Sequence, residues 1–406
     1  MKKNNLSILP ILLMALAFTN CDGKKESAII PGAEQTSKYL PYLKGKNVAM
    51  TINQTSTIGR QLSMDSLLSL GIKVVKGFGA EHGFRGGNSY DSVDVKTGIP
   101  TISLFRGKNK PTKEDLAGVD VMIFDMQDVG TRFYTFLATL HYVMEACAEN
   151  NIELIVFDRP NPNDFYVDGP IMEEKLKSFV GLDPIPIVHG MTFGEYAQML
   201  NGEGWLENKI KCKLRVIKIL NYEHGKPYFV PIPPSPNLNT QQSILLYPSL
   251  CLFEGTPMSV GRNTQPLMGF TVVGNPDLKG IYSFSFNVLE RQRVIPDSIK
   301  KGMSDNPPQV NRECYGLDLR NYNTNIFRET KRINLSWLIE LYNAYPYKDK
   351  FFNQGTNGQF RIDRLAGTSK LREQIIAGKT EKEIQDSWEP GLFQYKNTRM
   401  QYLLYK

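Results

Sequence analysis

The sequence predicts an α/β fold with a parallel sheet flanked by helices, and three observations lead to this expectation. Between Lys46 and about Tyr222, short apolar runs alternate with helical stretches, which is typical of strands joined by crossover helices. The chain has 406 residues, 41% hydrophobic and 22% charged, an ordinary globular composition with enough length for two domains. After about Asn221 the pattern changes, and residues 227–236 are rich in proline. A domain boundary is therefore expected near this segment.

Periodicity places the individual elements. The apolar positions of residues 131–149 step by three and four, which predicts one helix with one buried face. Thr380 and Glu383 fit a capping box at the start of the last expected helix. The strands are expected at 47–51, 72–78, 101–105, 119–124, 154–157 and 213–220, and the helices at 131–149, 193–200, 369–377 and 381–386.

Residues 1–21 are expected to be a lipoprotein signal peptide. Lys2 and Lys3 precede an apolar run over 6–18, too short for a permanent membrane span, and the run leads to Cys21 in a stretch that resembles a bacterial lipobox. Residues 22–37 would then be a flexible tether. We expect a cell-envelope lipoprotein that faces the periplasm and meets the membrane only through a lipid on Cys21. A plain secretory peptide, and so a secreted protein, is the alternative.

Charge and cysteine spacing argue against two kinds of partner. The chain has 48 basic and 41 acidic residues, a formal charge of +7, and no long basic run, which is a weaker bias than nucleic-acid binders usually show. The four cysteines after Cys21 lack Cys-x-x-Cys spacing, so no zinc site is predicted. The sequence leaves the pairing of these cysteines open. We therefore expect neither a metal nor a nucleic-acid partner.

Polar, glycine-flanked loops follow several of the expected strands. They cover residues 77–87, 125–134 and 158–162, and a further polar loop covers 189–192. Ligands bind outside the carboxyl ends of the strands in open parallel sheets. Several such loops on one edge predict a functional site there.

Three familiar kinds of site do not fit these loops. Gly77 and Gly79 start a dinucleotide fingerprint, but His82 stands where its third glycine is required. Asp125 and Asp128 are one residue too far apart for the Asp-x-Asp of phosphatases with an aspartyl nucleophile. The chain also has no Gly-x-Ser-x-Gly elbow for an esterase. No nucleotide cofactor is expected.

A site built on carboxyl groups remains. Glycoside hydrolysis needs a carboxylic acid that protonates the leaving oxygen, and usually a second carboxyl group as base or nucleophile. Glu81 is the best candidate for the acid, because it follows a strand among glycines that let a substrate approach. Asp128, Asp125 and Asp158 are possible partners, and Tyr134 could orient the substrate. The alternative for each carboxylate is a structural role in capping or bracing its loop.

The same loops resemble those of one bacterial family, the exo-acting β-N-acetylmuramidases of the NamZ type, long catalogued as a domain of unknown function. The resemblance runs from about Lys44 to the C-terminus. Its motifs are Glu-His-Gly-Phe-Arg-Gly (81–86), Asp-Met-Gln-Asp-Val-Gly-Thr-Arg-Phe-Tyr-Thr (125–135), Asp-Arg-Pro-Asn-Pro (158–162), Pro-Ile-Val-His-Gly-Met-Thr (186–192), Pro-Ser-Pro-Asn-Leu (234–238), Tyr-Pro-Ser-Leu-Cys-Leu-Phe-Glu-Gly-Thr (247–256) and Ser-Val-Gly-Arg (259–262).

This resemblance implies a Rossmann-like catalytic domain over 38–222 and a smaller auxiliary α/β domain over 223–406, with the site in the cleft between them. It implies release of N-acetylmuramic acid from the non-reducing end of peptidoglycan-derived saccharides, without a cofactor. Glu81 matches the family's catalytic glutamate, and Asp128 is our choice for the second group. The expected substrate-binding residues are His82, Arg85, Gln127, Arg132, Tyr134, Arg159, Asn161, His189 and Arg262.

The arginines in these motifs suit the lactyl carboxylate of muramic acid. A planar guanidinium binds a carboxylate with two parallel hydrogen bonds. Some of the arginines in the motifs are expected instead to pair with Asp125, Asp158 or Glu254. A rival hypothesis with the same cleft and anchor is a lipoprotein that binds muropeptides or sugars without cleaving them.

Overall fold

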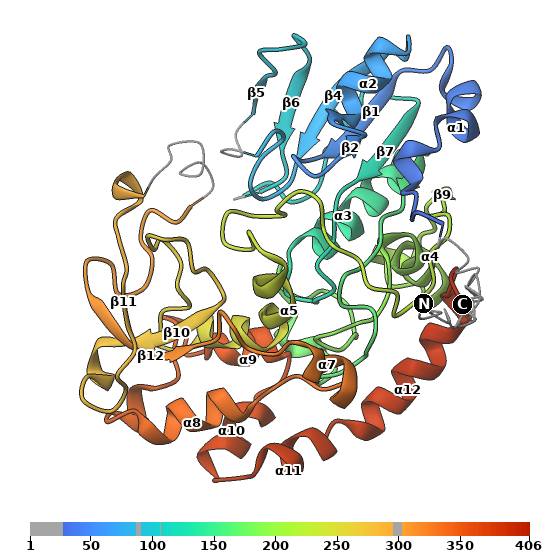
Figure 1. Cartoon of the computed structure of the whole chain (residues 1–406). Helices are drawn as coiled ribbons and strands as arrows, with labels where there is room; N and C mark the ends of the chain where they lie inside the picture. The colour runs from blue at the N-terminus through green and yellow to red at the C-terminus, as the bar shows by residue number, and fades with distance from the viewer. Residues whose placement is uncertain (1–26, 87–90, 106, 295–302) are drawn as a thin grey trace, which may run out of the picture.

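A seven-stranded sheet forms the framework of the first lobe, in the upper part of Figure 1. The computed structural model describes residues 27–86, 91–105, 107–294 and 303–406, so Cys21 and the expected signal peptide lie outside the described residues. The strand order is β5-β6-β4-β1-β7-β8-β9, with β5 antiparallel to β6 and the other pairs parallel. The expected α/β fold with a parallel sheet is confirmed. The strands are β1 (Val48–Ile52), β4 (Val74–Gly79), β5 (Ser92–Val93), β6 (Pro100–Ser103), β7 (Val121–Asp125), β8 (Glu153–Phe157) and β9 (Leu214–Ile217).

Each face of this sheet buries its own apolar core. In β1, Val48 and Met50 pack into the core beneath α1 and α2, whereas Ala49 faces the core that α3 and α4 cover. Central strands buried on both faces read as continuous apolar runs, which is why the sequence shows them so clearly. The covering helices are α1 (Thr36–Leu43), α2 (Ser63–Ser69), α3 (Phe136–Glu149) and α4 (Phe193–Glu203).

A second, smaller lobe follows the proline-rich segment. Its three-stranded antiparallel sheet has the order β10-β12-β11. Side chains of this lobe, such as Tyr247 and Trp337, belong to the same buried cluster as Phe124 of β7, so the lobes share one core. The elements are α5 (Gln241–Leu250), β10 (Val272–Asn275), β11 (Ser285–Asn287), β12 (Glu313–Asp318), α7 (Asn325–Thr330), α8 (Ser336–Ala344), α9 (Arg361–Ala366), α10 (Lys370–Ile376), α11 (Glu381–Asp386) and α12 (Glu389–Arg399).

The helix expected over 131–149 is five residues shorter, because α3 begins only at Phe136. The Arg132 N–H donates to the carbonyl of Ile187 at 2.8 Å, and Thr131 forms a bridge with Val188. Long-range backbone pairing therefore overrides the helical periodicity. The strand expected over 213–220 is also shorter, Leu214–Ile217, whereas the capping box of Thr380 and Glu383 is present at α11.

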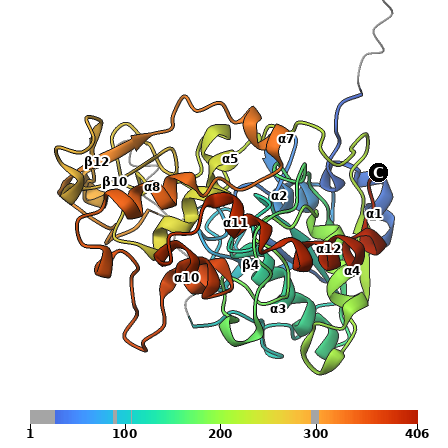
Figure 2. The ribbon, with the colours of Figure 1, turned by 90° about the horizontal axis from the view of Figure 1, so that it is seen from below.

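The last helix returns the chain to the first lobe. Figures 1 and 2 show α12 running from the second lobe back to α4, so that the described N-terminal segment and the C-terminus lie together. Arg399 Nε donates to the carbonyl of Gly190 at 2.9 Å, and the penultimate residue, Tyr405, donates its hydroxyl to Asp158 at 2.6 Å. Ile30 pairs with Leu220 beside β9. The sheet lobe is therefore completed by the two ends of the described chain.

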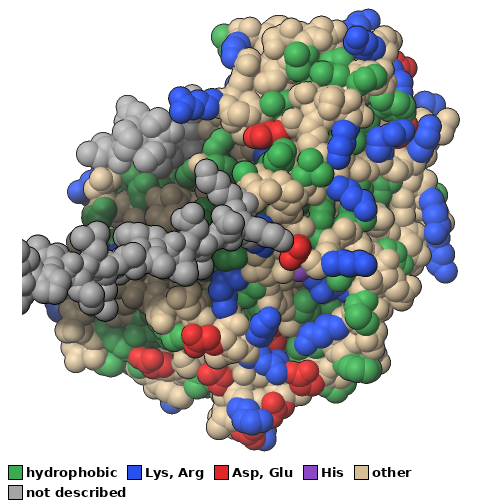
Figure 3. Space-filling view, turned by 45° about the vertical axis from the view of Figure 1, so that its right-hand side comes forward, with side chains coloured by type: hydrophobic (Ala, Val, Ile, Leu, Met, Phe, Trp, Pro, Cys, Tyr) green, Lys and Arg blue, Asp and Glu red, His purple; other side chains and the backbone are tan. Residues whose placement is uncertain are grey.

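The surface carries no single block of positive charge in the view of Figure 3. Lys and Arg side chains stand there as separate groups, mixed with Asp and Glu in the lower part. Within the described ranges, no helix is long and apolar enough to cross a membrane.

Candidate active site

A cavity of about 270 Å³ lies between the two lobes, and both supply its wall. The sheet lobe contributes the turn after β4 and the residues just before α3, and the second lobe contributes α5 and the 3₁₀ turn Cys251–Gly255. Aromatic and apolar side chains surround a few polar groups, as in most small-molecule sites. The lining residues are Glu81, His82, Phe105, Phe133, Tyr134, Thr135, Phe179, Val180, Ser235, Asn237, Leu238, Tyr247, Cys251, Glu254, Arg262, Phe270 and Leu365.

Glu81 reaches this cavity because the chain turns back sharply after β4. The Phe84 ring lies over Gly77, where a Cβ would come within 2.5 Å of the ring. His82 makes the turn with φ at 69°, a left-handed conformation that residues other than glycine rarely adopt. The Thr135 hydroxyl then donates to Glu81 Oε2 at 2.8 Å. The turn and the start of α3 together fix the carboxyl group.

Tyr134 lines the cavity beside Glu81 and is buried. Its hydroxyl donates to the carbonyl of Pro234 at 3.0 Å. Burial raises the pKa of Tyr134 well above its ordinary value, and the charges of Glu81 and Asp128 raise it further. The phenol therefore stays protonated, and its oxygen can accept a hydrogen bond from a ligand.

Asp128 and His189 lie outside this cavity lining. They are 2% and 0% exposed, respectively. His189 Nε2 is 3.2 Å from Asp128 Oδ2, although the two groups are not aligned as a hydrogen bond. His189 Nδ1 accepts from the N–H of Met191 at 3.2 Å, so Nε2 is the nitrogen that carries the proton. The two side chains form a buried pair behind the site.

Arg85 and Arg159 are engaged with carboxylates away from the cavity. Arg85 binds Asp65 at 2.7 Å and Asp94 at 2.6 Å. Arg159, which is 4% exposed, binds Asp125 at 2.6 Å. The expected pairing of a motif arginine with Asp125 is thus confirmed. Both guanidinium groups brace their loops.

Arg132 is buried, and no carboxylate of the described residues pairs with it. Its guanidinium donates to three backbone carbonyls, of Pro170 at 2.9 Å, Ile185 at 2.6 Å and Leu365 at 2.9 Å. Burial lowers the pKa of Arg132 to about 9. Since Leu365 belongs to α9, this side chain joins the two lobes.

Arg262 is the one of the four motif arginines that lines the cavity. Its Nη1 is 2.8 Å from Glu254 Oε1, which confirms the expected pairing of an arginine with Glu254. The turn before it requires glycine, because Gly261 has φ at 73° and a Cβ there would lie 2.4 Å from the carbonyl oxygen of Met268. The Ser-Val-Gly-Arg motif thus places the guanidinium group of Arg262 in the cavity wall.

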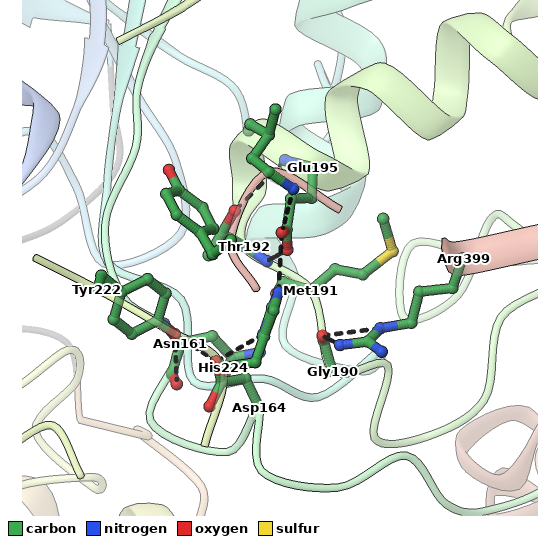
Figure 4. Close-up of polar contacts among 12 residues, drawn as sticks. Asn161, Asp164, Gly190, Met191, Thr192, Glu195, Tyr222, His224 and Arg399 are labelled. Atoms are coloured by element: carbon green, nitrogen blue, oxygen red, sulfur yellow. Dashed lines mark hydrogen bonds and ion pairs between the residues drawn. The ribbon is translucent and has the colours of Figure 1, made fainter. Parts of the chain in front are cut away.

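Gln127 and Asn161 hold loops together behind the cavity. Gln127 Nε2 donates to the carbonyl of Pro160 at 2.6 Å. Asn161 Nδ2 donates to the carbonyl of Met191 at 2.8 Å, in the network of Figure 4. Of the expected site residues, the structure brings Glu81, His82, Tyr134 and Arg262 to the cavity and places Arg85, Gln127, Asp128, Arg132, Arg159, Asn161 and His189 outside its lining.

Several lining residues were not singled out in the sequence. Ser235 and Asn237 come from the Pro-Ser-Pro-Asn-Leu motif, and Tyr247 and Cys251 from the motif over 247–256. Their presence in those motifs was the available signal, but it does not distinguish residues that line the cavity from residues that pack in the core. Phe105 and Phe179 lie outside every quoted motif, and only the fold brings them to the wall.

No metal site is formed by the described part of the chain: it contains no group of three or more His, Cys, Asp or Glu side chains placed to hold an ion. The four described cysteines, Cys147, Cys212, Cys251 and Cys314, are free thiols. The cavity lining offers carboxyl, hydroxyl, imidazole, amide, thiol and guanidinium groups.

Comparison with known proteins agrees with this geometry. The chain is 34% identical to the peptidoglycan β-N-acetylmuramidase NamZ of Bacillus subtilis (strain 168), over the full length of both. A crystal structure of a DUF1343 family protein from Bacteroides fragilis NCTC 9343 has 43% identity and a TM-score of 0.83, over 94% of this chain and 99% of that one. A second such protein has 26% identity and a TM-score of 0.74, over 93% and 99%.

Family models account for nearly the whole described chain. The model of the N-terminal part of the exo-β-N-acetylmuramidase NamZ matches residues 48–242, and that of its C-terminal part matches residues 245–405. The cavity between the lobes draws its wall from both matched regions. The chain belongs to the NamZ family of exo-β-N-acetylmuramidases, which are glycoside hydrolases.

Proposed function

We propose that this enzyme releases N-acetylmuramic acid, one residue at a time, from the non-reducing end of peptidoglycan fragments. The observation that carries the proposal is Glu81, a carboxyl group at a strand end in the cavity between the lobes of a NamZ-family chain. The size of the cavity supports the exo mode. At about 270 Å³ it lies just below the ~300–1,000 Å³ of most small-molecule pockets, so it suits one sugar ring and not a run of them.

Glu81 acts as the general acid in this proposal. Its Oε2 accepts the Thr135 hydroxyl hydrogen bond, which leaves the other carboxyl oxygen to carry the proton toward the leaving glycosidic oxygen. A carboxylic acid in this role is typical of glycosidases. Tyr134, held protonated next to it, accepts from a sugar hydroxyl.

The test is hydrolysis of a chromogenic N-acetylmuramic acid glycoside by the wild-type protein and by Glu81→Gln. We expect turnover by the wild type and a fall in kcat of about 10²–10⁴-fold in the variant, with binding of muramic acid retained by calorimetry. Binding without turnover by the wild type at any pH would indicate a sugar-binding lipoprotein instead.

We also propose that the chain acts in the cell envelope, facing the periplasm and anchored by a lipid on Cys21. The support is the leader itself, in which an apolar run over 6–18 leads to Cys21. An envelope location places the enzyme beside its proposed substrate.

A further inference from the structure

We propose that Glu254 is the second catalytic carboxylate, working across the cavity from Glu81. This inference rests on the proposed function and deepens it. Of the described residues that line the cavity, only Glu81 and Glu254 carry carboxyl groups. Asp128, the partner expected from the sequence, is buried against His189 outside the lining. A glycosidase that uses two carboxyl groups needs both at the scissile bond.

The two glutamates come from different lobes. Glu81 follows β4 of the sheet lobe, and Glu254 lies in the 3₁₀ turn Cys251–Gly255 that follows α5. Both glutamates lie near Cys251. Burial has the largest effect in raising the pKa of the Cys251 thiol, Glu254 raises it further, and Glu81 makes a smaller contribution. A ligand in the cavity would therefore meet one carboxyl group from each lobe.

Their polar partners differ in a way that assigns their roles. Glu81 accepts from a neutral hydroxyl, that of Thr135 at 2.8 Å. Glu254 contacts a cation, Arg262 Nη1, at 2.8 Å, and the two side chains are 30% and 26% exposed, respectively. The guanidinium group at this distance orients the Glu254 carboxyl group. Glu81 is thus the proton donor, Glu254 the proton acceptor, and Arg262 a positioning residue for Glu254.

In this proposal the reaction is a single displacement, in which water replaces the glycosidic oxygen at the anomeric carbon. Glu81 gives its proton to the glycosidic oxygen while the bond from that oxygen to the anomeric carbon breaks, and the electron pair stays on the oxygen. Glu254 removes a proton from a water molecule whose oxygen bonds to the anomeric carbon. The products are the free sugar and the shortened fragment, and the proton on Glu254 returns to Glu81 through solvent.

The test compares Glu254→Gln with Glu81→Gln on two muramic acid glycosides, one with a 2,4-dinitrophenyl and one with a 4-methylumbelliferyl leaving group. Loss of the base should lower kcat by about 10²–10⁴-fold on both substrates and remove the acid limb of the pH–rate profile. Loss of the acid should remove the alkaline limb and be relieved by the better leaving group. Glu340→Gln, at an exposed glutamate of α8, is the matched control and should resemble the wild type.

Each outcome decides the proposal. Glu254→Asp retains a carboxylate and should keep the acid limb at reduced rate, which tests the role even if Glu254→Gln fails to fold. A folded Glu254→Gln with near wild-type kcat and an intact acid limb would overturn the assignment while leaving the proposed function standing. A wild-type protein that cleaves neither glycoside would refute the proposed function, and this inference with it.

Discussion

At the scale of single residues, neighbouring groups decide what each charged side chain can do. Four arginines lie in the family motifs, and the sequence alone does not distinguish their roles. Three of them bind groups outside the cavity: Arg85 and Arg159 bind carboxylates, and Arg132 binds backbone carbonyls. Only Arg262 among the four lines the cavity. A guanidinium has five donors in a planar fork, so Arg262 can contact Glu254 along one edge and a ligand carboxylate along another.

We therefore expect Arg262 to set the preference for muramic acid over glucosamine. Arg262→Ala should reduce the ratio of kcat/KM for paired muramic-acid and glucosamine glycosides by about tenfold or more, because the lactyl carboxylate loses its charged partner. The ratio separates this effect from the lower rate that disturbance of Glu254 would cause on both sugars. Arg85→Ala, as control, should leave the ratio unchanged. Equal loss on both sugars would contradict a role in selection.

The sequence identified the acid candidate but not its surroundings. Glu81 could be singled out because a strand end and adjacent glycines are visible locally. The burial of Asp128 and the placement of Phe105 and Phe179 depend on contacts between segments that are distant in the sequence. A local sequence pattern does not reveal such contacts. Glu254 appeared in the sequence only as a possible partner for an arginine. Its place in the same cavity as Glu81 requires the second lobe to be in place.

At the scale of elements, long-range contacts adjust what periodicity predicts. The central strands and α11 agree with expectation because continuous apolar runs and a capping box are local signals. The first turn expected for α3 is lost to backbone pairing with 187–188. The tail after α12 is fixed onto α4 by a polar network (Figure 4): His224 contacts Asp164 and Glu195, each at 2.8 Å.

This network should make stability depend on pH. Burial opposes the charge on His224, but the hydrogen bonds that it donates to Asp164 and Glu195 outweigh this effect and raise the pKa of His224 from 6.5 to about 9. A raised folded-state pKa gives stability that is complete below the unfolded value and is lost as pH rises through about 9. Glu195 also accepts from the N–H of Leu404 at 2.8 Å, so loss of the cation should loosen the tail.

We expect His224→Gln to lower the free energy of unfolding by on the order of 2 kcal/mol near pH 6. The difference from the wild type should shrink as the pH approaches and passes about 9. Urea unfolding at a series of pH values measures it. His141, whose pKa is also raised to about 9, is present in both proteins and so cancels in the difference. A gap that stays constant with pH would mean that the imidazole acts by packing alone.

At the scale of the whole molecule, the proposed anchor and the site can be tested separately. Cys21→Ser should move the protein from the detergent phase to the aqueous phase and release it from membranes, because a multiply acylated cysteine holds a protein firmly whereas one chain holds it weakly. Activity of the purified variant on a soluble muramic acid glycoside should be unchanged. A wild-type protein recovered in the aqueous phase, with an N-terminus other than Cys21, would rule out the anchor.

The contact between Tyr405 and Asp158 also bears on when the molecule can finish folding. Asp158 follows β8, in the middle of the chain, and the hydroxyl that reaches it belongs to the penultimate residue. Burial raises the pKa of Asp158 to about 7 although that hydrogen bond opposes the rise, so the carboxyl group is costly to bury before Tyr405 arrives. Completion of this buried contact therefore depends on two residues that lie 247 positions apart in the sequence, and contacts of such separation are slow to form.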